Sequence, residues 1–286
     1  MGKRVLKTFC LLIIILALGA CSQKPGTGEA VLPQDFDEII LPFEADGKWG
    51  YINTKGETVI EPAYAYAGYF SDGLAIVSDG GLYGYINNRN QTVIPPKYTG
   101  AGEFANGYAV VCTGDWQSGT VLWGFIDITG KEVVTPQFLY MEGFTPEGRA
   151  LIWLQRGDEV VNGFVNTRGE VFIPDNYEIC SGFSDGLALI RQNGLFGYIN
   201  TDYDIAIPPQ YEFAGDFGEG VAYGEKDGSK YMIDRSGGIL ATVDYAFGSF
   251  SDGLASFRKD NLYGYINKEG EVVIEPRFAW AKDFCN

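Results

Sequence analysis

Phenylalanine recurs along this chain at intervals of 33 to 40 residues. The recurring positions are Phe36, Phe70, Phe104, Phe144, Phe183, Phe217, Phe250 and Phe284. Seven similar units therefore extend from residue 36 to residue 286. A fixed period of this length is typical of repeat architectures, because one small unit cannot bury its apolar face alone and must stack on its neighbours.

Five of the seven units contain an aromatic–glycine–aromatic–aliphatic segment that predicts a β-strand, and Asn162–Val165 is a diverged copy without the first aromatic residue. Side chains alternate between the two faces of a strand, so the two aromatic rings share one face and the glycine faces the other way. A glycine inside a strand usually marks the close approach of another backbone or a large side chain. The segment Lys230–Ile233 is a diverged copy without the glycine. The residues that define the segment in the other units are Trp49, Gly50, Gly84, Trp123, Gly124, Gly163, Gly197 and Gly264.

Turn signals separate this strand from two others in each unit. An acidic residue or Asn followed by Gly, as in Asp72-Gly73, suits a turn with positive φ. Asn or Asp three positions ahead of a Gly, as in Asn53 to Gly56, is typical of a type I turn. A β-branched run then ends at a proline, which cannot donate to a sheet. The sequence thus predicts a three-stranded meander per unit, with a possible fourth strand near the opening phenylalanine.

These motifs resemble the WG repeat family, and the resemblance covers residues 36–286. The segments that match best are Gly47–Ile52 and Phe250–Phe278. The resemblance implies a β-rich interaction module. It supplies no catalytic residues.

The fold class predicted is therefore all-β, with the seven units in one of two arrangements. Seven small blades can close into a propeller-like ring, which is a common number for a propeller. The alternative is an open β-superhelix, in which each unit contacts only its neighbours. The number of units leads us to favour the closed ring, although the two ends show no obvious strand exchange.

The first 21 residues have the features of a lipoprotein signal. A basic start at residues 3–7 precedes an apolar run at residues 9–18, which is too short to span a membrane as a helix. Residues 18–21 resemble a bacterial lipobox, which implies lipidation of Cys21. Residues 22–35 are rich in Gly, Pro and polar residues and are expected to form a flexible tether. The protein is therefore expected in the bacterial cell envelope, anchored to a membrane and facing away from the cytoplasm.

Charge and composition exclude several functions. Three of the 21 Lys and Arg residues lie in residues 1–21, so the remainder has 18 basic against 37 acidic residues and a net charge of −19. Such a surface repels nucleic acid. The chain has no histidine, which excludes His-ligated zinc and His-based nucleophilic sites. Cys112, Cys180 and Cys285 show no framework spacing and are expected to be buried thiols. No cofactor or metal site is predicted.

The third and fourth units are longer than the others, and the extra residues fall between the first two predicted strands. Insertions in repeat proteins map to loops on one face, which is often the binding face. The candidate binding residues are Asp115 and Trp116 in one insertion and Arg156 in the other. Trp116 is the strongest candidate. The alternative is a longer hairpin with this ring folded back onto the surface.

The sequence therefore predicts a non-catalytic envelope lipoprotein whose repeats form a scaffold for an extracytoplasmic protein or peptide. The first alternative is a binder of cell-wall glycan or another polysaccharide, with Trp116 stacking on the sugar. Less favoured is a hydrolase with carboxylates gathered at a ring centre. The aspartates that recur in the Asp-Gly turns, Asp72, Asp185 and Asp252, are better explained by turn chemistry, because each belongs to its own unit.

Overall fold

The computed structural model describes residues 39–281. These residues form seven separate antiparallel β-sheets and contain no helix, hence none that is long and apolar enough to cross a membrane. The first three sheets contain β1 (Ile40–Ala45), β2 (Lys48–Asn53) and β3 (Thr58–Tyr64); β4 (Tyr66–Ala67), β5 (Leu74–Ser78), β6 (Tyr83–Asn87) and β7 (Thr92–Tyr98); and β8 (Gly100–Ala101), β9 (Tyr108–Thr113), β10 (Leu122–Asp127) and β11 (Glu132–Phe138).

The other four sheets repeat this order. They contain β12 (Tyr140–Met141), β13 (Arg149–Arg156), β14 (Glu159–Asn166) and β15 (Val171–Phe172); β16 (Glu178–Ser184), β17 (Leu187–Gln192), β18 (Leu195–Asn200) and β19 (Ile205–Tyr211); β20 (Phe213–Ala214), β21 (Val221–Lys226), β22 (Ser229–Asp234) and β23 (Ile239–Val243); and β24 (Leu254–Lys259), β25 (Leu262–Asn267) and β26 (Val272–Phe278).

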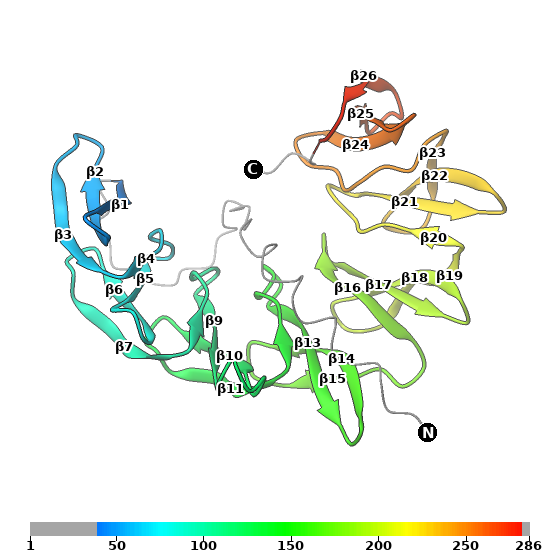
Figure 1. The fold of residues 1–286 in the computed structure, drawn as a ribbon. Helices are drawn as coiled ribbons and strands as arrows, with labels where there is room; N and C mark the ends of the chain where they lie inside the picture. Colours follow the sequence, from blue (N-terminus) through cyan, green and yellow to red (C-terminus); the bar gives the residue numbers. More distant parts are fainter. Residues whose placement is uncertain (1–38, 282–286) are drawn as a thin grey trace, which may run out of the picture.

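The sheets follow one another along an open arc (Figure 1). The sheet β1–β3 and the sheet β24–β26 stand apart at its two ends, so the units do not close into a ring. The strands β9, β13 and β16 lie toward the inside of the arc, and β3, β7 and β11 lie on its outside. The sheets follow one another in propeller-like order, but the favoured closed ring does not form, because the first and last sheets do not pair with each other. The protein adopts the open alternative.

Five of the seven sheets have a fourth strand, as the sequence allowed. This first strand is only two residues long in four of them, whereas β16 has seven residues and an irregular register. Strands β3 and β4 are separated by the single residue Ala65. The chain therefore passes directly from the last strand of one sheet into the next sheet.

The hydrophobic core lies between neighbouring sheets. One buried cluster joins Tyr85 and Ile94 of the second sheet to Val111 and Ile126 of the third, with Phe104 between them. The small alanine that follows each Asp-Gly type turn is at most 1% exposed, which confirms that it faces a close neighbour. Apolar burial between units therefore holds the array together, as expected for stacked repeats.

The recurring phenylalanine packs against an aromatic ring of the preceding unit. This ring belongs to the residue directly after the strand glycine. The ring centroids of Tyr51 and Phe70 are 4.9 Å apart, and those of Tyr85 and Phe104 are also 4.9 Å apart. The Tyr85 hydroxyl donates a hydrogen bond to the Gly102 carbonyl at 2.7 Å. This contact, repeated from unit to unit, is the physical origin of the phenylalanine period, and it places these rings in the core and not on an exposed stripe.

The strand glycine lies against a bulge in the last strand of its own sheet. The register shifts between the pairs Trp49–Tyr64 and Tyr51–Ile60, because β3 has two more residues than β2 over this stretch. A Cβ atom on Gly50 would lie 2.4 Å from the Ile60 carbonyl oxygen and 2.7 Å from the Pro62 nitrogen. The glycine and the proline that ends the strand therefore belong to one contact, as the sequence predicted for the glycine.

Candidate functional site

The Asp-Gly type turns join neighbouring units along one edge of the arc. Asp72 and Gly73 both have positive φ, as predicted for this turn. The Asp72 carboxylate accepts a hydrogen bond from the backbone N–H of Gly107 in the next unit at 2.7 Å, and Asp185 accepts one from Gly220. These aspartates therefore fix the spacing of units, in addition to forming their turns.

Cations reinforce this edge in the later units. Asp185 pairs with Arg235, and Glu219 pairs with Lys268 at 2.6 Å. The hydrogen bond from Lys268 lowers the pKa of the Glu219 carboxyl. Because Asp72, Asp185 and Glu219 each have a partner in the next unit, this edge is an inter-unit fastening.

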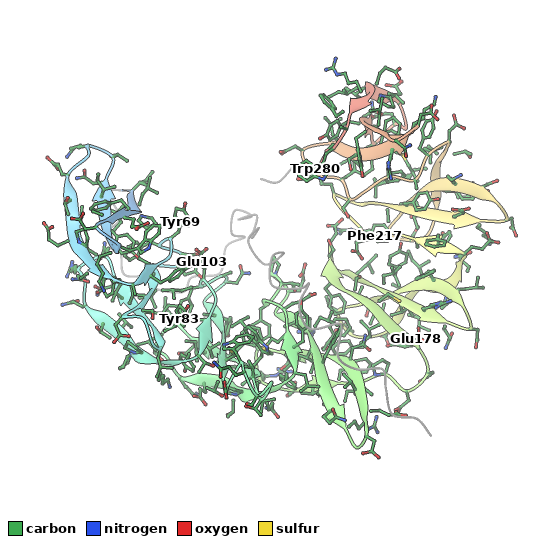
Figure 2. All side chains as sticks on the ribbon, in the orientation of Figure 1. Tyr69, Tyr83, Glu103, Glu178, Phe217 and Trp280 are labelled. Carbon is green, nitrogen blue, oxygen red and sulfur yellow. The ribbon has the colours of Figure 1, made fainter. Side chains whose placement is uncertain are left out.

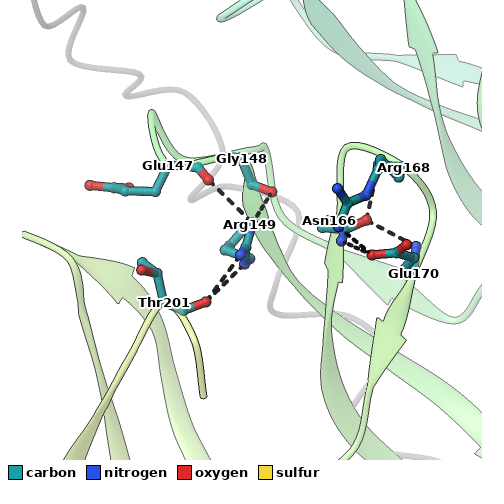
Figure 3. Close-up of polar contacts among 7 residues, drawn as sticks. All are labelled: Glu147, Gly148, Arg149, Asn166, Arg168, Glu170 and Thr201. Atoms are coloured by element: carbon teal, nitrogen blue, oxygen red, sulfur yellow. Dashed lines mark hydrogen bonds and ion pairs between the residues drawn. The ribbon is translucent and has the colours of Figure 1, made fainter. Parts of the chain in front are cut away.

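The junction between the fourth and fifth units carries a different fastening (Figure 3). Arg149 donates hydrogen bonds to the Thr201 carbonyl at 3.0 and 3.3 Å, and its guanidinium lies 5.5 Å from the centroid of the Tyr203 ring. Tyr203 has φ of +69° at a turn position that glycine or asparagine occupies in the other units. Its ring stacks on Phe172 at 4.1 Å, so packing compensates for a backbone conformation that a bulky residue rarely adopts.

A pocket of about 500 Å³ lies beside this junction, where the first strands of the fourth, fifth and sixth units meet. We call it the inner-edge pocket. Its carboxylates are Glu142, directly after β12, and Asp216, two residues after the end of β20. The full lining is Tyr140, Glu142, Leu151, Trp153, Cys180, Ser181, Gly182, Phe183, Ser184 and Asp216.

The two carboxylates carry unfavourable charge. Loss of solvation raises the pKa of Glu142, and the nearby Asp216 charge raises it further, while a hydrogen bond with Tyr140 opposes the shift. Loss of solvation also raises the pKa of Asp216, against a hydrogen bond with Ser181. Glu142 is half-buried and Asp216 is exposed at the mouth. Such shifts in a concave site mark a candidate binding or catalytic position.

The inner-edge pocket is lined by aromatic residues on one side and by small residues on the other. The rings of Tyr140 and Trp153 are 5.4 Å apart, and Trp153 is 42% exposed. A Cβ atom on Gly182 would lie 2.6 Å from a Glu142 carboxylate oxygen. Glycine at position 182 therefore leaves the space that the Glu142 side chain occupies.

The candidates predicted from the insertions lie elsewhere. Asp115 and Trp116 share the loop between β9 and β10, where the Asp115 carboxylate accepts a hydrogen bond from the Gln117 N–H. The Trp116 indole N–H donates to the Thr99 carbonyl at 3.2 Å, and its ring lies 6.0 Å from that of Trp123. The ring is thus folded back onto the surface, yet 52% of Trp116 is exposed. Its binding role stays a prediction.

Arg156 lies at the tip of the hairpin between β13 and β14 and pairs with Asp175 at 3.9 Å. It is not part of the inner-edge pocket. Cys21, the predicted tether at residues 22–35, Phe36, Phe284 and Cys285 lie outside the described residues. Cys112 is a buried thiol as expected, but the same expectation is wrong for Cys180, which is exposed because it lies at the pocket.

Sequence reasoning missed the inner-edge pocket, although one signal was present. Two residues before the recurring phenylalanine, Glu142 stands where five of the other seven positions have a small residue, the exceptions being Gln34 and Lys282 at the two ends. The equivalent residues are Gly68, Gly102, Ser181, Gly215 and Gly248. A carboxylate at a position reserved for small residues is a break in the repeat that points to this site. Across residues 39–281, no group of three or more Cys, Asp or Glu side chains is placed to hold a metal ion.

The fold and its junctions define a scaffold built from β-repeats, with its cores and fastenings between units. A family model described as "WG containing repeat" matches it in every unit, and the chain belongs to this family. The matched residues are 49–83, 83–115, 123–152, 163–196, 196–229, 232–263 and 263–286. The family predicted from the sequence is thereby confirmed. No curated protein matches the chain.

Among solved structures, a crystal structure described as the eukaryotic initiation factor is similar at a TM-score of 0.50 and 12% identity, over 82% of this chain and 72% of that chain. This likeness concerns the fold alone. The β-propeller domain of the Trilobed protease from Pyrococcus furiosus is similar at a TM-score of 0.40 and 13% identity, over 84% of this chain and 85% of that chain. Apo AztD from Citrobacter koseri is similar at a TM-score of 0.39 and 13% identity, over 86% of this chain and 82% of that chain.

Proposed function

We propose that this protein is a non-catalytic lipoprotein of the bacterial cell envelope that holds an extracytoplasmic protein or peptide on its repeat array. The observation that carries the proposal is the continuous fastening of unit to unit. Buried clusters and inter-unit hydrogen bonds run through successive junctions, so the array is a rigid curved surface. Extended curved surfaces of this kind are what repeat proteins use to bind other proteins.

The side chains near the ends of the arc support a binding role. Tyr69 is 59% exposed at one end and Trp280 is 68% exposed at the other, and both can be followed in Figure 2. Large aromatic side chains are enriched in protein interfaces because each contributes much apolar area at low entropic cost. Anchoring through Cys21 would keep this surface outside the cytoplasm.

A second candidate is binding to cell-wall glycan or another polysaccharide. The half-exposed ring of Trp116 favours it, because sugars stack on exposed aromatic faces and the hydrogen bond to Thr99 holds the ring in place. Asp115 beside it could accept hydrogen bonds from sugar hydroxyls. Arg156 would serve either function as an exposed cation on the neighbouring insertion.

Retention by solid supports separates these functions. The full chain, purified in non-ionic micelles, is mixed with cell wall and separately with envelope proteins coupled to beads. Retention on the protein beads alone, unchanged in Trp116→Ala, is the expected result. Retention on cell wall alone, lost in Trp116→Ala, would replace the scaffold by the glycan binder, and turnover in a panel of hydrolase substrates would refute the non-catalytic proposal.

The anchor has its own test in cells. Metabolic labelling with a radioactive fatty acid is expected to label the wild-type chain and not Cys21→Ser. The labelled chain is expected in the membrane fraction. A wild-type chain that takes up no lipid would contradict the lipoprotein proposal and leave the scaffold proposal untouched.

A further inference from the structure

We propose that the inner-edge pocket binds a cationic side chain, lysine or arginine, presented by the protein or peptide that the array holds. The inference rests on the proposed function and adds the chemistry of its partner. It is carried by a cavity whose walls combine two carboxylates with an aromatic pair, the half-buried Tyr140 and the exposed Trp153. The four groups that do the binding are Glu142, Asp216, Tyr140 and Trp153.

The first step is the charge inside the cavity. Within residues 39–281, neither Glu142 nor Asp216 forms an ion pair with Lys or Arg. Elsewhere on the array the acidic groups do have cations, as Glu219 has Lys268. The charges that act on Glu142 include only the like charge of Asp216. A bound cation would relieve this repulsion and restore the interaction that solvent provides at an open surface.

The second step is the aromatic wall. Tyr140 and Trp153 meet at an interplanar angle of 53°, so their faces are not closed against each other. An ammonium or guanidinium group is attracted to the face of such a ring, and the attraction is strongest for Trp. The aliphatic stem of a lysine or arginine side chain also packs well on an aromatic surface. Two carboxylates at the end of an aromatic wall therefore fit an organic cation better than an inorganic one.

The third step is size. A cavity of about 500 Å³ lies within the range of sites for small organic ligands, roughly 300–1,000 Å³. Ca²⁺ needs about six to eight oxygen ligands at short range, and no group of three or more Cys, Asp or Glu side chains gathers in the described part of the chain. The pocket is thus too large and too poor in ligands for a metal ion alone.

The test is a titration in which the full chain, in non-ionic micelles, is added to a peptide. Binding is measured from the broadening of the peptide's NMR lines. The probe is acetyl-Gly-Lys-Gly-amide, and its matched control is acetyl-Gly-norleucine-Gly-amide, which has a similar stem and no charge. We expect the lysine peptide to bind at least about ten-fold more tightly than the norleucine peptide. This ratio corresponds to about 1.4 kcal/mol. Equal affinity of the two peptides, or no binding of the lysine peptide at millimolar concentration, would overturn the proposal.

Variants localise the binding. Glu142→Gln and Asp216→Asn are each expected to weaken lysine-peptide binding about ten-fold, and Trp153→Leu about three-fold. Glu103 is a control at another junction, where it accepts a hydrogen bond from the Tyr69 N–H at 3.4 Å, outside the inner-edge pocket. Glu103→Gln removes this charge and is expected to leave the affinity unchanged. An equal loss in Glu103→Gln would show that the net negative charge attracts the peptide, and would refute the pocket.

Two further measurements test whether a variant loses binding because it misfolds, and whether the natural ligand is a small free amine instead of a peptide side chain. Glu142→Gln removes a poorly solvated charge, so its melting temperature is expected to equal or exceed that of the wild type while lysine-peptide binding is weakened. 1,5-Diaminopentane serves as a free amine source. Competition by the lysine peptide at lower concentration than the diamine supports a peptide side chain, and tighter binding of the diamine would contradict it.

The proposal can also fail separately from the scaffold. If the wild-type chain retains envelope proteins and Glu142→Gln retains them equally, the scaffold stands and the pocket does not bind the partner. If neither chain retains proteins while the lysine peptide still binds, the cation site stands and the scaffold proposal fails.

Discussion

The second and sixth units solve the same packing problem differently. In the second, Gly84 lies under a bulge of β7, where a Cβ would be 2.5 Å from the Ile94 carbonyl oxygen. In the sixth, Tyr231 occupies the equivalent position, and β22 pairs with β23 residue by residue from Lys230–Val243 to Met232–Ala241. The strand β23 also contains no proline. In these two units, the strand glycine and the proline-containing bulge are either both present or both absent.

This difference teaches what the glycine is for. It is not needed for the strand, because β22 forms without it, and a strand is intrinsically weaker with glycine than with tyrosine. It is needed where the backbone of the partner strand comes close to it, as at a bulge. The changes below are expected to break or sharpen this comparison, from the largest effect to the smallest.

Adding a Cβ at Gly84 is expected to cost the most. In Gly84→Ala the methyl group would meet the backbone of Ile94 and Pro96 at 2.5 and 2.6 Å, and backbone cannot move aside as a side chain can. We expect a loss of about 3 kcal/mol in the free energy of unfolding, measured by urea denaturation. The control is Gly143→Ala, which meets nothing within 4 Å and should cost less than about 0.5 kcal/mol. Equal losses would show that the bulge does not select glycine.

Removing the fastening between the second and third units comes next. In Asp72→Ala the Gly107 N–H loses its carboxylate acceptor, which we expect to cost about 2 kcal/mol beyond the backbone effect. Asp46→Ala is the matched control, because Asp46 has φ of +51° in a hairpin turn of the first unit and Asp72 has φ of +48°. The difference between the two variants isolates the hydrogen bond. If they lose the same amount, the bond contributes nothing to stability.

A smaller effect is expected from the hydroxyl of Tyr85. Tyr85→Phe removes the 2.7 Å hydrogen bond to the Gly102 carbonyl and is expected to cost about 1 kcal/mol. The third unit shows that the ring alone can be sufficient, because Phe125 stands there and stacks on Phe144 at 3.9 Å. Tyr83→Phe is the control for a half-buried tyrosine. A loss in the control as large as in Tyr85→Phe would contradict the role of the bond.

The last prediction concerns pH and compares the pocket with the fastening edge. The pKa of Glu142 is raised in the folded state, so the folded chain holds the proton more tightly than the unfolded chain. Its contribution to stability is therefore lost as pH rises through the raised pKa. The melting temperature of Glu142→Gln minus that of the wild type, both measured by circular dichroism, is therefore expected to increase from pH 4 to pH 7.

Glu219→Gln should behave in the opposite way. The Lys268 hydrogen bond lowers the pKa of Glu219, so its contribution is present at neutral pH and is lost as pH falls through the lowered pKa. The variant is expected to lose stability at pH 7 and to approach the wild type in acid. The same pH trend in both variants would refute the assignment of opposite environments.

Much of the local structure follows from the sequence because its causes are local. The turn from Asn53 to Gly56 forms as predicted, with the Gly56 N–H donating to the Asn53 carbonyl at 3.0 Å and the Asn53 side chain accepting from Lys55 and Glu57. The strand glycine was expected to meet a neighbouring backbone, and it does. The fourth strand was foreseen only as a possibility, because two residues such as those of β4 carry too little pattern to predict.

The sequence alone determined the seven β-units, the aromatic contact that spaces them and the membership in the WG-containing repeat family. Its motifs recur at a nearly fixed interval, and the residue types in them have local structural preferences. Tertiary structure decided the open arc, because the curvature is set by small rotations at every junction and not by any single motif. It also decided the inner-edge pocket. Glu142 and Asp216 are far apart in the chain and occupy different positions of their repeats, and only the stacking of the units between them brings their charges together.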